Sequence, residues 1–268
     1  MKNKPSRILV TAGDTYELID EVRRVTHMGT GRLGSLIADE FIRQGAEVTY
    51  LCGETSMRPT EKVRKTVEIT GVMELLKAMD ELLDEEKYDA LIHSMAVSDY
   101  TVRGVTTEQD LVGELEKEIT QMDNPGQLRS TIEHAIRQAQ YLADGKLSSD
   151  LETLTVFMAR APKVISIVKQ KQPNILLVGF KLLVGVTESE LINAAKRQMQ
   201  NSGSDFVLAN DLDTIQGDEH CGILIDETGI IDRPKTKPDI ASSIARAVLT
   251  KIQGNQGDQG DQENESSR

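Results

Sequence analysis

Cysteine is scarce in this chain. Cys52 and Cys221 are far apart, and neither belongs to a C-x-x-C pair. A disulfide framework needs more cysteines than this, and a thiolate zinc site needs closely spaced ones, so the sequence supports neither. We expect both cysteines to be reduced and buried, as free cysteines commonly are.

Basic residues and long apolar runs are also in short supply. The chain has 31 Lys and Arg against 43 Asp and Glu, a net charge of −12. Nucleic acids and anionic membranes bind basic surfaces, so we expect neither as a partner, although an anionic small molecule could bind where a few basic side chains converge. No apolar stretch approaches the roughly 20 residues that span a bilayer, and MKNKPSRILV lacks the apolar segment of a signal peptide. These features predict a soluble, cytoplasmic protein.

Short apolar runs alternate with amphipathic stretches along most of the chain. This alternation predicts an α/β fold, in which right-handed crossovers build a mostly parallel sheet with helices on both faces. A closing hairpin is predicted from GILIDE and GIIDR. The expected strands are 7–12, 47–52, 65–69, 88–95, 153–158, 175–180 and 205–210, and the expected helices are 30–46, 72–86, one beginning at Pro162, one near Glu188, and 238–252.

Two segments depart from this alternation. Between Asp99 and Lys146 the sequence is charged and poor in strand signals, and its helical periodicity predicts an inserted helical flap at about 101–145. The last residues, GNQGDQGDQENESSR, contain nothing apolar to bury. We therefore expect one α/β domain over 1–253, with the insert, followed by a disordered acidic tail over 254–268.

The stretch GTGRLG at 29–34 has the spacing of a dinucleotide fingerprint, G-x-G-x-x-G. In that fingerprint the glycines directly follow the first strand, but here 16 residues separate Ala12 from Gly29. Glu54 does stand where a ribose-binding acid is expected, so a nicotinamide enzyme remains an alternative. Gly29, Thr30 and Gly31 at a helix start can in any case bind phosphate through backbone N–H groups. The other interpretation is a helix cap whose glycines only permit close packing.

Five segments in order resemble phosphopantothenate–cysteine ligase, also called phosphopantothenoylcysteine synthetase. These are VTAGDTYELIDEVRRVTHMGTGRLG, HSMAVSDY, KLSS, LVGFKL and LANDL, which together cover most of residues 7–240. The absence of an attached flavin decarboxylase domain is similar to the free-standing bacterial form. The resemblance implies a Rossmann-like three-layer sheet and a homodimer. No G-x-S-x-G or H-E-x-x-H motif supports a hydrolase instead.

The resemblance also implies a reaction. The carboxylate of 4′-phosphopantothenate attacks the α-phosphate of a nucleoside triphosphate, CTP in bacterial members with ATP as the alternative, to give an acyl-nucleotidylate and pyrophosphate. L-cysteine then displaces the nucleotide through its amine and forms an amide, on the pathway to coenzyme A. Mg²⁺ is the implied cofactor. Carboxylate attack on a triphosphate brings like charges together, so cations, backbone donors and positioning must supply most of the catalysis.

The resemblance assigns roles to particular residues. Lys146 would engage the phosphates and His27 would contact the acyl-nucleotidylate, as the two catalytic residues. Gly29, Thr30 and Gly31 would bind phosphate. The expected nucleotide-binding residues are Gly13, His93, Ser94, Met95, Ala96, Asp99, Lys146, Val178, Gly179, Phe180, Asn210, Lys235 and Lys237, and no protein ligand to a metal is expected.

Plain structural roles compete with several of these assignments. Lysines are mostly solvated, an Asp after a strand often caps the next segment, and a Phe at a strand end is more often core. His27 replaces the family's asparagine, Asp14 replaces its second glycine, and Asn201 stands where relatives often carry lysine. A catalytically impaired regulatory subunit is therefore a further alternative. The insert could be a dimer arm, a substrate lid or both.

Overall fold

The protein consists of two compact units. The computed structural model describes residues 4–143 and 145–265, the last ten of these by backbone alone. The first unit, which we call the sheet unit, comprises residues up to 15, 28–96 and 163 onward. The second, the insert unit, comprises 16–27 and 97–162. The inserted part is therefore larger than the predicted 101–145, and it also takes in a segment close to the start of the chain.

An eight-stranded sheet forms the centre of the sheet unit. Its strand order is β12-β11-β10-β9-β6-β1-β4-β5, and the six strands from β10 to β5 are mutually parallel, while β11 and β12 form an antiparallel hairpin at one edge. The mostly parallel sheet and the closing hairpin are as predicted. The strands are β1 (Arg7–Ala12), β4 (Glu47–Gly53), β5 (Lys65–Ile69), β6 (Ala90–His93), β9 (Leu176–Leu183), β10 (Phe206–Gln216), β11 (Glu219–Asp226) and β12 (Gly229–Asp232).

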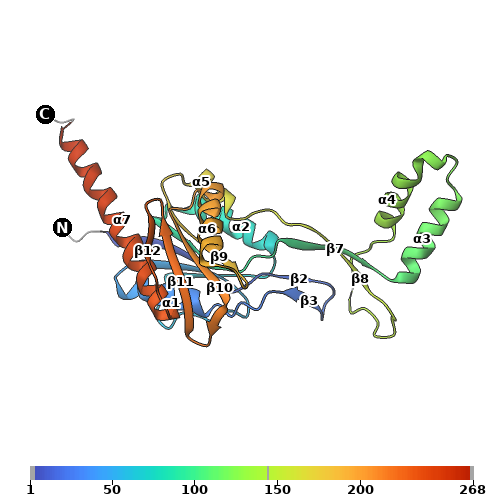
Figure 1. Ribbon diagram of the computed structural model, residues 1–268, viewed down its shortest axis with the longest axis horizontal. Coiled ribbons are helices and arrows are strands. Elements are labelled where there is room, and N and C mark those ends of the chain that lie inside the picture. Colours follow the sequence, from blue (N-terminus) through green and yellow to red (C-terminus); the bar gives the residue numbers. More distant parts are fainter. Residues whose placement is uncertain (1–3, 144, 266–268) are drawn as a thin grey trace. The chain divides into compact units, whose positions relative to one another are not determined.

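Helices cover both faces of this sheet (Figure 1). On one face α1 (Arg32–Arg43) and α7 (Lys237–Glu265) pack side by side, and Phe41, Ile244 and Val248 belong to the core beneath them. On the other face lie α2 (Val72–Glu85), α5 (Ser166–Lys171) and α6 (Glu188–Ser202). The three-layer α/β prediction is thus confirmed.

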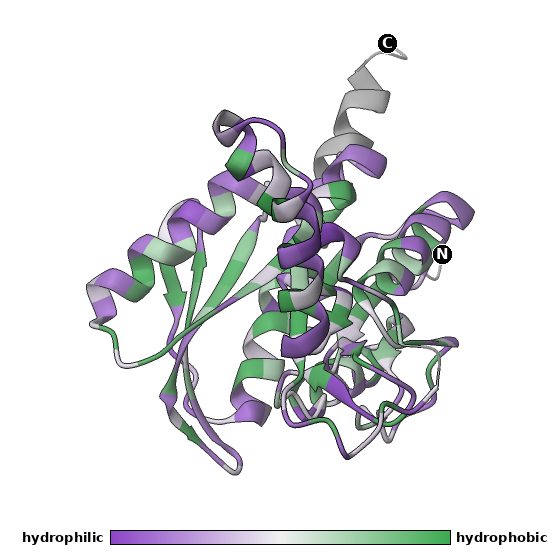
Figure 2. Cartoon of the chain, turned by 90° about the vertical axis from the view of Figure 1, so that its right-hand side faces the viewer, coloured by the Kyte–Doolittle hydropathy of each residue, from purple (hydrophilic) through white to green (hydrophobic). Residues whose placement is uncertain are grey.

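Hydrophobic periodicity explains these elements. The strands are mostly green in Figure 2, whereas the helices carry long hydrophilic stretches. β1 has five consecutive buried residues, as a strand covered on both faces requires. α6 begins where predicted, because Thr187 and Glu190 form a reciprocal capping box. Apolar burial and local capping together determine where most strands and helices of the sheet unit begin and end.

The insert unit contains strands as well as helices. β7 (Tyr100–Thr106) pairs with β8 (Thr155–Arg160), and β2 (Tyr16–Leu18) pairs with β3 (Arg24–Thr26), both antiparallel. α3 (Glu108–Thr120), a short 3-10 turn η1 (Pro125–Gln127) and α4 (Leu128–Gln138) follow β7. The purely helical flap was therefore wrong, since the β-branched residues of YTVRGVT favour a strand. β8 was also wrongly assigned to the central sheet.

The helix expected at Pro162 begins later, at Ser166. The N–H of Ala161 donates to the carbonyl of Asp99 at 2.8 Å, so the strand pairing of β8 continues to this residue. The residue before a proline also disfavours helical backbone, which agrees with an extended Ala161.

The carboxyl-terminal segment and the cysteines also differ from expectation. The backbone of α7 continues through Glu265, over much of the predicted tail, and residues 266–268 lie outside the described part. Cys52 is buried as predicted, but Cys221 is exposed, and both are free. Among the described residues, no helix combines the length and apolarity needed to cross a membrane.

Candidate active site

The carboxyl ends of the parallel strands lie along one edge of the sheet. At β1 and β6 the order of the strands reverses, because β4 and β5 extend the sheet on one side and β6, β9 and β10 extend it on the other. In open α/β sheets such a switch point forms a crevice where ligands bind. Five predicted nucleotide-binding residues lie at or directly after the ends of β1 and β6, and four lie within β9 and β10: Gly13, His93, Ser94, Met95 and Ala96, and Val178, Gly179, Phe180 and Asn210.

A cluster of glycines brings the start of α1 close to the end of β1. Gly13 and Gly31 have φ of 84° and 76°, a region that favours glycine. A Cβ on Gly31 would lie 2.9 Å from the Cβ of Ser56 and 3.3 Å from the Cα of Gly13. Gly31 is also the N-cap of α1 and supplies no side-chain cap. The start of α1 is thus a helix terminus of the kind that binds anions, and it is held against β1.

The segment after β6 is fixed to β1 by backbone bonds. The N–H of Ala96 donates to the carbonyl of Gly13 at 2.8 Å, and the N–H of Thr15 donates to that of Ala96 at 3.0 Å. The Ser94 hydroxyl donates to the carbonyl of Thr11 at 2.6 Å. A Cβ on Gly34 would lie 2.7 Å from Ser94 Oγ, so the third glycine of GTGRLG serves close packing. Residues 93–96 therefore form a rigid wall at the switch point.

His93 is neutral in this wall. Its ring Nδ1 lies 2.9 Å from Thr11 Oγ1, and burial lowers the pKa of His93 to about 4. At neutral pH the ring therefore carries no charge and offers only neutral hydrogen-bonding groups. His93 can support a ligand by shape and hydrogen bonding, but it does not neutralise phosphate.

Two basic side chains lie where α1 and α7 begin. The Arg32 guanidinium contacts Asp218 through Nε at 2.7 Å and Nη2 at 2.6 Å. The backbone N–H of Lys237 donates to the carbonyl of Asp218 at 3.0 Å, and its Nζ donates to the carbonyl of Gly217. Burial lowers the pKa of Lys237, Arg32 adds to this effect and Asp218 opposes it. Arg32 thus pairs with the Asp218 carboxylate, while Lys237 bonds to the main-chain carbonyls of Gly217 and Asp218, so two cations lie close together at the amino ends of two helices.

His220 lies near the start of β11, two residues after Asp218. It is 6% exposed, and neither ring nitrogen has a partner within the described part of the chain. Burial and the nearby Lys237 lower the pKa of His220 to about 4. Cys221 is exposed, so the two neighbours face opposite ways along the strand and are poor joint metal ligands. Lys235 is exposed, and its carbonyl accepts from the N–H of His220 at 2.9 Å.

The residues on β9 and β10 differ in exposure. Val178 is fully buried in the core, and Phe180 is partly buried against it on the face that α1 and α7 cover. A Cβ on Gly179 would lie 2.6 Å from Gln198 Nε2 on α6, so this glycine is needed for packing whether or not a ligand approaches. Asn210 is 5% exposed. Of this group, Phe180 presents the most accessible side chain.

Comparisons with known proteins decide the family. The sequence pattern of the DFP family, described as the DNA/pantothenate metabolism flavoprotein C-terminal domain, matches residues 3–132 and 134–252. The chain belongs to the DFP family. The predicted resemblance is therefore confirmed.

Known members and solved structures agree with this assignment. The coenzyme A biosynthesis bifunctional protein CoaBC of Thermococcus kodakarensis is 32% identical over 239 residues, which cover 89% of this chain and 49% of that protein. A DNA/pantothenate metabolism flavoprotein from Streptococcus pneumoniae superposes with a TM-score of 0.72 at 35% identity, covering 93% of this chain and 99% of that one. The chain thus spans about half the length of its bifunctional relative.

A more distant protein shares the fold. A Cab2 variant solved in complex with phosphopantothenate-cysteine has a TM-score of 0.64 at 15% identity, over 93% of this chain and 87% of that one.

Three residues assigned from the DFP resemblance lie in the insert unit. His27, Asp99 and Lys146 are all exposed. Asp99 follows β6 in sequence and accepts the N–H of Ala161 through its carbonyl, so its backbone begins the pairing of β7 with β8. Lys146 lies in a segment, 145–148, that forms neither helix nor strand. The other assigned residues, including Gly29, Thr30, Gly31, Lys235 and Lys237, belong to the sheet unit.

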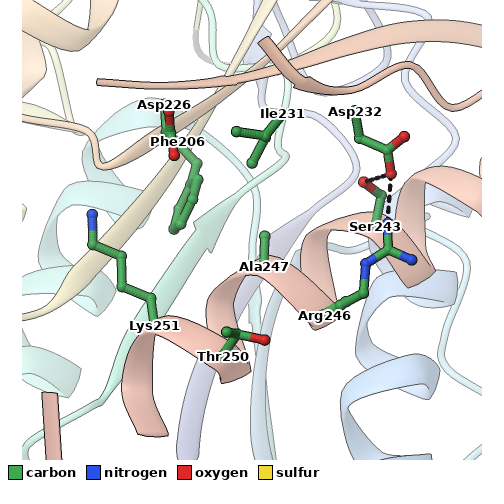
Figure 3. A pocket seen from close by; sticks show the side chains of 9 residues that line it. All are labelled: Phe206, Asp226, Ile231, Asp232, Ser243, Arg246, Ala247, Thr250 and Lys251. Carbon is green, nitrogen blue, oxygen red and sulfur yellow. Dashed lines mark hydrogen bonds and ion pairs between the residues drawn. The ribbon is translucent and has the colours of Figure 1, made fainter. Parts of the chain in front are cut away.

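A separate cavity of about 380 Å³ lies between α7 and the β11–β12 hairpin (Figure 3). Arg246 and the hydroxyl of Ser243 both contact Asp232 there, at 2.7 and 2.6 Å. Phe206 on its wall starts β10, so the cavity lies away from the carboxyl ends of the parallel strands. It contains none of the residues that the DFP resemblance assigned.

Some residues of this edge were missed in the sequence. Arg32 stands inside GTGRLG, but only the fold shows that it meets Asp218, which is 186 residues away. Ser56 carries no motif, yet it fills the space beside Gly13 and Gly31. The sequence signal for Arg32 was its position directly after Gly31, because phosphate sites often combine a helix start with a nearby cation.

Proposed function

We propose that this chain joins 4′-phosphopantothenate to L-cysteine through an acyl-nucleotidylate. Its DFP family membership and its CoaBC relatives support a role in coenzyme A biosynthesis. The observation that carries the proposal is the crevice edge, where the start of α1 lies beside Gly13 and residues 93–96, with Arg32 and Lys237 close by. Phosphorylated substrates of this kind do not cross bilayers unaided, so the proposed place of action is the cytoplasm.

The charge distribution suits two anionic substrates. The whole chain carries −12, yet Arg32, Lys237 and two helix amino termini converge at this edge. A triphosphate would compete with Asp218 for Arg32, because a phosphate group offers the guanidinium the same paired acceptor geometry as a carboxylate. The positive ends of α1 and α7 would add to the attraction. Lys235, which is exposed nearby, would reach the triphosphate tail.

Other residues would hold the nucleoside. Phe180 would pack against the base, and Asn210 would offer an amide to the base or the ribose. Residues 93–96 would form the adjoining wall, and Asp99 would contact the nucleotide, as the family resemblance implies. CTP is the proposed triphosphate and ATP the alternative, because a few backbone contacts decide between them. Gly29, Thr30 and Gly31 would bind a phosphate group.

The bond changes divide into two displacements. First, a carboxylate oxygen of phosphopantothenate bonds to the α-phosphorus, and the bond to the departing pyrophosphate breaks. Second, the cysteine amine bonds to the acyl carbon, the acyl–oxygen bond breaks, the nucleoside monophosphate leaves, and the amine loses a proton. Lys146 would stabilise charge on the phosphates during the first step, since a flexible ammonium can follow moving charge. His27 would donate an N–H to the acyl-nucleotidylate.

Magnesium would enter with the triphosphate. Mg²⁺ is commonly held by one or two carboxylates plus substrate phosphates and water. Within residues 4–143 and 145–265 no group of three or more acidic, His or Cys residues could hold a metal, and Asp14 lies at the end of β1 beside the glycines. These residues fit a cation that arrives on the nucleotide, which would offset the negative charge of Asp14. Bound there, the ion would neutralise phosphate charge.

We also propose a homodimer. Several apolar side chains of the insert unit are exposed, with Leu142 at 74% and Val22 at 62%. In the proposed dimer, a partner would cover apolar side chains such as these. Light scattering coupled to size-exclusion chromatography should give twice the chain mass of 29.6 kDa.

Pyrophosphate release tests the proposed reaction. The chain should release pyrophosphate from CTP and phosphopantothenate in the presence of Mg²⁺, and cysteine should convert the intermediate to product. Release without cysteine isolates the activation step and shows that His27 permits it. An impaired regulatory subunit would bind these compounds but release no pyrophosphate. A nicotinamide enzyme would be stabilised against heat by NADP and not by CTP with Mg²⁺.

A further inference from the structure

Asp20 in the insert unit is a buried acceptor for four donors. The residue is 3% exposed. Oδ1 accepts the backbone N–H groups of Val22 at 2.9 Å and Arg23 at 2.6 Å, which closes the turn between β2 and β3. Oδ2 accepts the guanidinium of Arg23 at 2.5 Å and the backbone N–H of Leu147 at 3.1 Å. Oδ1 therefore bonds to the backbone of the turn, whereas Oδ2 bonds to the Arg23 side chain and, beyond the turn, to Leu147.

The bond to Leu147 joins segments 127 residues apart. The guanidinium of Arg23 also reaches the carbonyl of Leu147 at 3.5 Å, so the pair of Asp20 and Arg23 meets both backbone groups of this residue. Leu147 directly follows Lys146, whose side chain is exposed. Gly145, which directly precedes Lys146, has a φ of 85°. A Cβ built on Gly145 would have no neighbour within 4 Å, so close packing at this position does not hold the backbone of residues 145–148 in place.

We infer that Asp20 is a positioning residue that fixes the backbone beside Lys146 and so holds its ammonium in place. This inference rests on the proposed function, in which Lys146 engages the phosphates. Burial alone would raise the pKa of Asp20, but the N–H groups of Val22, Leu147 and Arg23 and the Arg23 charge hold it below its usual value. The carboxylate is therefore ionised at neutral pH and accepts all four bonds. A flexible lysine gains the most from such an anchor, because small misplacements in a site are costly.

The variant Asp20→Asn separates the two tasks of this side chain. An asparagine keeps one oxygen, which can still accept the bonds of Val22 and Arg23 within the turn. Its amide nitrogen would then face the N–H of Leu147 and the guanidinium of Arg23, which are donors and cannot bond to it. The β2–β3 turn should survive while the tie to residue 147 is lost. Asp226→Asn is the matched control, because Asp226 closes the β11–β12 turn through Thr228 and Gly229 in the same manner.

Steady-state kinetics of the full chain test the inference. Asp20→Asn should lower kcat by about 10-fold to 100-fold with little change in KM for phosphopantothenate, while Asp226→Asn leaves both unchanged. In a Lys146→Ala background Asp20→Asn should cost nothing further, because Asp20 acts through Lys146. An equal loss in both backgrounds would overturn the inference.

Hydrogen exchange gives a readout that does not require activity. Asp20→Asn should speed amide exchange over 145–150 and leave α3 unchanged. If wild type releases no pyrophosphate, the proposed function fails, yet faster exchange at 145–150 would still support the anchor. Unchanged exchange there would overturn the anchor even in an active enzyme. Asp20→Ala, which also removes the turn bonds, should speed exchange in β2 and β3 as well.

Discussion

A Cβ atom on Gly13 would lie 1.6 Å from the hydroxyl oxygen of Ser56, so these two residues fit together only because Gly13 has no side chain. Ser56 also approaches Gly31, and the loop that carries it accepts the hydroxyl of Tyr50 through the carbonyl of Met57 at 2.8 Å. The end of β1, the start of α1 and the loop after β4 therefore form one tightly packed corner. The proposed anion site depends on this corner.

Gly13→Ala should destabilise the fold by more than Gly45→Ala. Gly45 has nearly the same φ, 87°, but nothing lies within 4 Å of a Cβ there, so its variant measures the backbone cost alone, about 1–2 kcal/mol. The collision at Gly13 should add at least about 2 kcal/mol. Urea denaturation compares the two variants, and Ser56→Gly should recover part of the loss in Gly13→Ala. Equal losses without recovery would contradict a packed corner.

Stability should fall as the pH drops from about 6.5 to about 4. Burial lowers the pKa of both His93 and His220 to about 4, whereas unfolded histidines titrate near 6.5. Between these values the unfolded chain binds more protons, so the free energy of unfolding declines by up to about 1.4 kcal/mol per pH unit for each histidine. Chemical denaturation across this range measures the slope.

Histidine variants identify the source of that slope. His93→Gln should reduce it by about half. His220→Gln should reduce it by a similar amount, because burial lowers the pKa of His220 to about 4 as well. A slope that persists in His93→Gln and in His220→Gln would assign the pH dependence to other groups.

Lys146→Ala should lower the rate of pyrophosphate release by about 10²-fold or more, as for other charged groups that stabilise a transition state. Lys77→Ala is the control, since Lys77 is 78% exposed on α2 and lies 3.9 Å from Glu81. Rapid-mixing measurements of the activation step compare the variants. A Lys146→Ala rate equal to that of Lys77→Ala would remove Lys146 from the site.

Arg32→Gln should weaken binding of the triphosphate by about 10-fold or more, because a charge-assisted pair with phosphate is lost. The weakening should diminish as salt screens the interaction. Arg246→Gln is matched to it, since Arg246 also pairs with a carboxylate, Asp232, at 2.7 Å but lines the separate cavity. Calorimetric titration with CTP and Mg²⁺ measures both. Equal affinities would place the triphosphate away from Arg32.

The sequence predicts the fold where apolar periodicity is strong. RILVTA and ILLVGF became β1 and β9 because a strand covered on both faces must be apolar throughout. β2 and β3 were missed since they are short and largely exposed, so no burial pattern marks them. TLTVFM was predicted as a strand correctly but placed in the wrong sheet. Periodicity indicates that a strand exists, and pairing with YTVRGVT decides where it lies.

The candidate site, like the fold, could be predicted where a local sequence pattern marks it and not where it depends on contacts between distant segments. The rule that ligands bind at strand carboxyl ends places Gly13, residues 93–96 and Asn210 along one edge from sequence order alone. Contacts between distant segments escape such reasoning. Arg32 with Asp218 and Asp20 with Leu147 lie 186 and 127 residues apart, and no local pattern pairs them.

The fate of the substrate oxygens tests the central claim most directly. Phosphopantothenate with isotopically labelled carboxylate oxygens is incubated with CTP, Mg²⁺, cysteine and the full chain, and the products are analysed by mass spectrometry. Attack at the α-phosphate predicts one labelled oxygen in the released nucleoside monophosphate and one in the amide of the product. Label in inorganic phosphate together with a nucleoside diphosphate, or no labelled nucleotide at all, would contradict activation through an acyl-nucleotidylate.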